Sequence, residues 1–172
     1  MELTKYVACI CEGAAEQAII ELLLDDDKLV FTRDDMLEGE PIRCRSAKGF
    51  EAQYLRKGFT EGITVLRILD SRREQFRLSK AYVDKIEVIN VITAPEIEML
   101  IIFREGKYEE YKRSGMKPSE FSKIELRYSN VKNVEFVKSY FADTAILISA
   151  LKEYKRVSHI QRGEYTLADL LK

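Results

Sequence analysis

The sequence predicts an α/β fold, in which a mainly parallel sheet of about four strands is flanked by helices and followed by a helical C-terminal region. Two observations predict it. Short apolar runs alternate with helix-like segments through the first half of the chain, and two of these runs, 7–11 and 63–69, each end on an acidic residue. Alternation of strands and helices implies right-handed crossovers and parallel strand pairing.

The length and the net charge of the chain limit its domain organisation and its binding partners. The chain has 172 residues, enough for one domain with a sizeable core. We expect an α/β core over residues 1–105 and a helical extension over 106–172 that packs on it to form a single compact domain. The net charge of −1 provides no general attraction to nucleic acid or to anionic membranes, so any phosphate-binding surface must be a local patch.

Cysteine usage and hydropathy favour a cytoplasmic protein. Three cysteines do not form a disulfide framework, and we expect Cys9 and Cys11 to lie inside a strand as small hydrophobic residues. Cys44 and His159 do not have the spacing of a zinc site. No signal peptide is recognisable, and no apolar run approaches the ~18 residues of a membrane span.

The expected strands are short apolar runs bounded by polar or turn-forming residues. They are 7–11, 41–45, 63–69 and 86–92, with a further short strand at 29–31. Gly13 provides the turn into an amphipathic helix that runs through Leu24, and the acidic run 25–27 after it is expected in a solvated loop. A short helix is expected within 50–59.

The second half of the chain is expected to be helical. Thr93 and Glu96 have the spacing of a capping box, with Pro95 in the first turn, so a buried helix should begin there. The remaining helices are expected at 108–113, 119–126, 134–140 and 144–156, with a last capped turn at 166–169.

Three acidic residues form the candidate site. Glu12 and Asp70 follow strands, at the carboxyl edge of the sheet where α/β proteins bind ligands, and Glu98 lies in the apolar helix after the fourth strand. Carboxylates from separate elements are the ligands that Mg²⁺ uses in phosphodiester chemistry, so the three would be catalytic residues and magnesium ligands. Glu12 could instead be a general acid or base.

Structural roles for these acids are open alternatives. Asp70 could cap a following helix, and Glu98 could pair with Arg67 or Arg72. Glu16, one turn after Glu12, is expected to be a solvated acid favoured by the helix dipole.

A basic segment follows Asp70 directly. Four cations are candidates for binding nucleic-acid phosphates: Arg72, Arg73, Arg77 and Lys80. The same residues could equally form an exposed helix face.

These motifs resemble a known family. Cys11-Glu12-Gly13 after a strand, with Asp70 closing a later one, resembles the Rossmann-like TOPRIM domain of topoisomerases, primases and OLD-type nucleases. The closer similarity is to RloB-like proteins, small TOPRIM relatives of bacterial restriction and phage-defence loci. They pair an opening like Ile10-Cys11-Glu12-Gly13 with a later Asn-Pro-x-x-Glu motif, which places Glu98 on the glutamate. The resemblance covers about residues 5–105, and it implies Mg²⁺ and a nucleic-acid phosphodiester reaction.

The chain departs from the TOPRIM pattern at one position. The family has Asp-x-Asp where this sequence reads Asp70-Ser71-Arg72, and a cation in the second place opposes Mg²⁺. Glu74 is a candidate replacement ligand. Two hypotheses follow: a magnesium-dependent nuclease in a bacterial defence setting, or a catalytically degenerate module that binds nucleic acid or an ATPase partner. A third, weaker one is a sensor of a small phosphate ligand.

Overall fold

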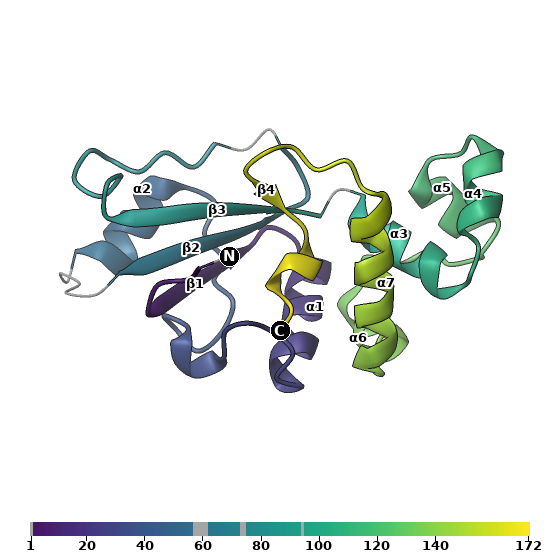
Figure 1. Cartoon of the computed structure of the whole chain (residues 1–172), viewed down its shortest axis with the longest axis horizontal. Coiled ribbons are helices and arrows are strands. Elements are labelled where there is room, and N and C mark those ends of the chain that lie inside the picture. The colour runs from purple at the N-terminus through teal and green to yellow at the C-terminus, as the bar shows by residue number, and fades with distance from the viewer. Residues whose placement is uncertain (1, 57–61, 73–74, 94) are drawn as a thin grey trace.

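The sheet has four strands, all parallel, in the order β1-β2-β3-β4 (Figure 1). The computed structural model describes residues 2–56, 62–72, 75–93 and 95–172, without the side chain of Glu96. The strands are Tyr6–Cys11, Ile63–Leu69, Ile86–Ile92 and Glu164–Tyr165. This arrangement confirms the predicted α/β fold.

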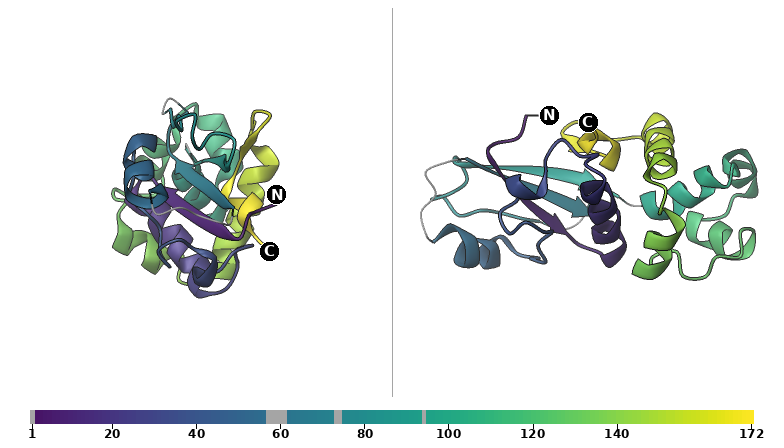
Figure 2. Two further views of the ribbon diagram at one scale, coloured as in Figure 1. Left: turned by 90° about the vertical axis from the view of Figure 1, so that its left-hand side faces the viewer. Right: turned by 90° about the horizontal axis from the view of Figure 1, so that it is seen from below.

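Seven α-helices are described, most of them after β3. They are α1 (Ala14–Asp25), α2 (Ala47–Phe50), α3 (Glu96–Arg104), α4 (Tyr108–Ser114), α5 (Pro118–Ile124), α6 (Val134–Tyr140) and α7 (Thr144–Val157). A π-helical turn, Glu51–Leu55, extends α2, and two 3₁₀ turns lie at Arg33–Asp35 and Leu167–Leu170. Helices α3 to α7 gather beyond one end of the sheet, which gives the molecule an elongated shape (Figure 2).

Two apolar clusters cover the two faces of the sheet. Successive side chains of a strand point to opposite faces, and β1 follows this rule. Cys9 and Cys11 are buried, as predicted, in the larger cluster with α1, α3 and α7. Ala8 and Ile10 face the smaller cluster, which contains Phe50 of α2. Both faces of the sheet are therefore covered, as expected for parallel strands.

Two predicted strands are not strands in the structure. Residues 41–45 make one bridge to β1, in which the N–H of Ile42 donates to the carbonyl of Cys9 at 2.7 Å. Pro41 has no N–H to extend that pairing. Residues 29–31 likewise make one antiparallel bridge, between Leu29 and Leu171. That partner lies at the far end of the sequence, so no local pattern indicated it.

The start of α3 differs from the prediction. Pro95 is its N-cap, and Thr93 lies before it with its hydroxyl donating to the carbonyl of Leu69 at 2.9 Å. The N–H of Thr93 donates to the same carbonyl at 2.7 Å. Thr93 therefore extends the pairing of β3 with β2 and does not cap the helix, so the predicted capping box is wrong.

The later helices follow their predicted signals closely. Asp143 caps α7, accepting from the N–H of Ala145 at 2.9 Å. Gly115, with a φ of 66°, ends α4 in the left-handed conformation that glycine adopts without strain. Thr166 and Asp169 form the predicted capping box of the last turn.

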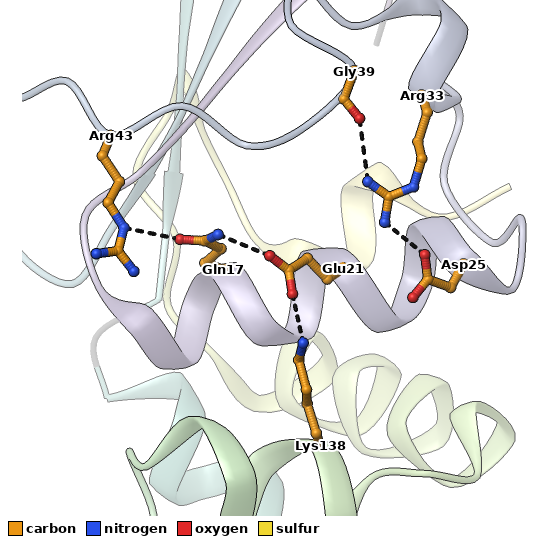
Figure 3. Close-up of polar contacts among 7 residues, drawn as sticks. All are labelled: Gln17, Glu21, Asp25, Arg33, Gly39, Arg43 and Lys138. Carbon is orange, nitrogen blue, oxygen red and sulfur yellow. Dashed lines mark hydrogen bonds and ion pairs between the residues drawn. The ribbon is translucent and has the colours of Figure 1, made fainter.

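A chain of polar contacts runs along the outer face of α1 (Figure 3). Arg43 donates to Gln17 at 3.1 Å, Gln17 donates to Glu21 at 2.8 Å, and Glu21 pairs with Lys138 of α6 at 2.8 Å. Further along the helix, Asp25 pairs with Arg33. These contacts fasten α1 to the loop after it and to α6.

None of the described helices combines the length and apolar character that crossing a lipid bilayer requires.

Candidate functional site

Glu12 and Asp70 meet at the carboxyl edge of the sheet. Strands β1 and β2 are neighbours in register, with Cys11 opposite Ile68, so the residues after them are brought together. Glu12 donates its N–H to the carbonyl of Ile68 at 3.0 Å, which continues the strand pairing by one residue. Its Oε2 accepts the N–H of Asp70 at 3.0 Å. The predicted placement of these two acids at one edge is therefore seen in the structure.

Glu16 lies beside this pair and is buried. Its side chain is bent back over Gly13, the residue before α1, where a Cβ would lie 2.0 Å from Glu16 Oε2. Glycine at position 13 therefore makes room for the carboxyl group. The hydroxyl of Thr93 lies 3.4 Å from the other oxygen, Oε1.

Burial governs the electrostatics of Glu16, which is 2% exposed. Burial raises the pKa of its carboxyl group above the ordinary value, and the negative charge of Asp70 adds to this. Its own backbone N–H and the positive charge of Lys132 act in the opposite direction and only partly compensate. The expectation of a solvated Glu16 is wrong, because glycine three residues earlier lets the side chain fold inward.

Glu98 lies on α3, and its cationic partner comes from the C-terminal region. The side chain is 9% exposed, and Oε1 lies 3.5 Å from Nζ of Lys132. Oε2 is buried and has no hydrogen-bond partner among the described residues. The alternative pairing with Arg67 or Arg72 is therefore wrong. Sequence reasoning missed Lys132, because it lies in an irregular segment between α5 and α6 with no motif around it.

The described cations of the basic segment after β2 are exposed, and none of them lies on a helix. Arg72 donates through Nε to both carboxylate oxygens of Glu164 in β4, at 3.1 and 3.0 Å. Arg77 and Lys80 are exposed in the irregular chain that leads to β3. Arg73 lies outside the described residues, as does Glu74, the candidate replacement ligand.

The described acids do not form a ready metal-binding group. Across residues 2–56, 62–72, 75–93 and 95–172, no group of three or more Asp, Glu, His or Cys side chains is placed to hold a metal ion. Glu98 directs Oε1 to the ammonium of Lys132, and Glu12 directs Oε2 to a backbone N–H. The catalytic and metal-binding roles of Glu12, Asp70 and Glu98 stay predictions.

Neither protein-family models, nor curated proteins, nor solved structures give a match to this chain. The resemblance to TOPRIM and RloB-like proteins therefore stays a prediction. The structure itself shows an α/β fold with a four-stranded parallel sheet.

Proposed function

We propose that this chain is a TOPRIM-like module that binds nucleic acid through its phosphates and carries no resident metal ion. The observation that carries the proposal is the position of Lys132. Its ammonium lies 3.5 Å from Glu98 Oε1, and its charge lowers the pKa of Glu16 against the effect of burial. A lysine thus provides the positive charge among these carboxyl groups that a divalent cation would provide in a metal site.

The basic segment after β2 supports contacts to phosphates. Glu164 holds Arg72 through Nε, and the two terminal nitrogens of the guanidinium have no hydrogen-bond partner in the described part of the chain. A guanidinium fixed in this way is well suited to bind a phosphate. Arg77 and Lys80 add exposed charge in the same segment.

Nucleic-acid binding at several salt concentrations tests the proposal. We expect labelled single-stranded DNA or RNA to bind equally well in EDTA and in Mg²⁺, with an affinity that falls as salt rises. Arg77→Ala and Lys80→Ala should each weaken binding and reduce the slope of log K against log[salt] by about 1. Lys152→Ala, the same type of change at an exposed position of α7, is the matched control and should leave the slope unchanged.

Two results would overturn this assignment. Binding that disappears in EDTA would contradict the absence of a metal ion. If neither DNA nor RNA binds, nucleic acid is the wrong partner, and an ATPase partner, the other possibility for a catalytically degenerate module, is the proposal to test next.

Magnesium-dependent phosphodiester cleavage in a bacterial defence setting is the second candidate function. The contact between Glu12 and Asp70 favours it, because it gathers two of the three predicted acids at one edge. It predicts cleavage of DNA or RNA in Mg²⁺ that is lost in Glu12→Gln and Asp70→Asn while binding is kept. Cleavage that persists in both variants would exclude these acids as its catalytic residues.

A further inference from the structure

A pocket of about 270 Å³ lies where the carboxyl edge of the sheet meets the helical region. Arg72, three residues after β2, lines it from the sheet, and Pro95 and Met99 line it from α3. The rest of the described lining comes from α4 and from the C-terminal end of α7 with the residues after it. Sites for drug-sized ligands begin at roughly 300 Å³, so this pocket suits a ligand the size of a single nucleotide.

The walls of this pocket are mainly aromatic and aliphatic. Tyr108 and Tyr111 of α4 are half-buried, and their ring centroids lie 6.4 Å apart with 34° between the ring planes. Met99 and Ile160 add aliphatic surface. Nucleobases pack on aromatic side chains, and all four bases do so because each has a π-face. The walls therefore suit a flat, uncharged ring system such as a base.

The polar groups of the pocket suit the sugar-phosphate part of such a ligand. They include the guanidinium of Arg72, the hydroxyl of Ser158 and the imidazole of His159, and none of the described lining residues has a carboxyl group. Glu164 binds Arg72 through Nε, which leaves the two terminal nitrogens of the guanidinium for a ligand. An aromatic wall beside a held arginine matches a base joined to a phosphate.

We propose that this pocket binds the base of one nucleotide in a single strand, while Arg72 contacts the adjoining phosphate. A base in a duplex is paired and stacked, so it reaches a pocket only after it has been extruded from the helix. The inference rests on the proposed function and adds two properties to it. The partner is single-stranded, and it is held by a base contact that tolerates any sequence as well as by charge.

Two oligomers of equal length and charge test the proposal, an oligothymidylate and its abasic counterpart, which has the same sugar-phosphate chain without bases. We expect the native chain to bind the oligothymidylate about tenfold more tightly, within the range that one base stacked on an aromatic ring contributes. Tyr111→Leu keeps an apolar side chain but removes the ring, so it should reduce this preference severalfold and leave the affinity for the abasic oligomer unchanged. Tyr54→Leu, the same change at a half-buried tyrosine beside α2, is the matched control and should keep the preference.

A fluorescent variant tests the same contact directly and does not depend on the folding of Tyr111→Leu. The chain has no tryptophan, so Tyr111→Trp introduces a single indole into the pocket and keeps an aromatic ring there. The oligothymidylate should quench its emission and the abasic oligomer should not, because the quenching requires contact with a base. In Tyr54→Trp, neither oligomer should quench the emission.

The outcomes separate this pocket from the proposed function. Equal affinity of the native chain for the two oligomers, or quenching of Tyr111→Trp by both alike, would overturn the base pocket and leave phosphate binding intact. If neither oligomer binds but thymidine monophosphate quenches Tyr111→Trp, the pocket binds a free nucleotide and the proposed function fails. If none of the three binds, both proposals are wrong.

Discussion

The carboxylate of Glu12 accepts the backbone N–H of Asp70 at 3.0 Å, which ties the residue after β1 to the residue after β2. Glu12, which the resemblance to TOPRIM proteins makes a candidate metal ligand, thus accepts a hydrogen bond from the backbone at the end of the neighbouring strand. The contact fixes Asp70, the residue before the basic segment, relative to the sheet. The contribution of this hydrogen bond to the free energy of unfolding can be measured without any ligand.

Removing this contact should destabilise the protein. We expect Glu12→Ala to lower the free energy of unfolding by about 1 kcal/mol, because a charge-assisted hydrogen bond to a backbone N–H is lost at a partly exposed place. Glu12→Gln should lose less, since its amide oxygen can still accept. Urea unfolding measures both, with the exposed Glu125→Ala as the control. Equal losses in the alanine and glutamine variants would show that the hydrogen bond contributes nothing.

Glu16→Gln should stabilise the protein at neutral pH. Burial raises the pKa of Glu16 in the folded state above 4.5, so ionising this group favours the unfolded chain. We expect a gain of about 1 kcal/mol at pH 7, the usual size of a buried polar penalty. The gain should shrink as pH falls and vanish below 4.5, where both states hold the proton. Thermal or urea unfolding across this range measures it, and a gain that is constant with pH would contradict the ionisation argument.

The ion pair between Glu21 and Lys138 should contribute stability with the opposite pH dependence (Figure 3). Partial burial acts to raise the pKa of Glu21, but the bonds from Lys138 and Gln17 outweigh it and lower that pKa. The contribution is therefore present above pH 4.5 and is lost as pH falls through the folded-state pKa. A double-mutant cycle with Glu21→Gln and Lys138→Met should give a coupling of about 0.5 kcal/mol at pH 7, reduced in high salt. If the coupling energy is unchanged at a pH at which Glu21 is protonated, the interaction between Glu21 and Lys138 is not ionic.

Glu164→Gln should strengthen nucleic-acid binding. The change removes the negative charge beside Arg72, while the glutamine amide oxygen can still accept from Nε and keep the guanidinium in place. We expect about threefold tighter binding at moderate salt, and a slightly steeper salt dependence. Anisotropy titrations measure both, with Glu153→Gln, which removes the partner of Arg156 on α7, as the control. No change in affinity would show that Arg72 does not contact phosphate.

The elements that sequence predicted well have strong local signals. Mainly apolar runs gave β2 and β3 their bounds, and Asp143 marked the start of α7. Strand β4 has two residues and no apolar pattern of its own, so nothing in the sequence indicated it. The residues at 29–31 and 41–45 contain β-forming side chains, but each makes a single bridge, whose partner is set by tertiary packing.

The candidate site was predictable where it depends on strand order and not where it depends on long-range packing. Parallel pairing of β1 with β2 brings Glu12 to Asp70, and the alternating pattern was enough to expect it. The partner of Glu98 comes from residue 132, and the partner of Arg72 comes from residue 164. Both are charged residues in or beside irregular segments, and such positions have no periodicity that would indicate where they lie.

The pairing of β3 with β4 has a consequence for synthesis on the ribosome. The residues of β2 and β3 are available to pair once both strands have emerged, but Asn90 and Val91 gain their partners Glu164 and Tyr165 only after residues 93–163 have been made. An unpaired strand edge is a site for association with other chains. The nascent chain therefore carries an open edge while residues 93–163 are translated, and binding of a chaperone during that interval would protect the edge until β4 is made.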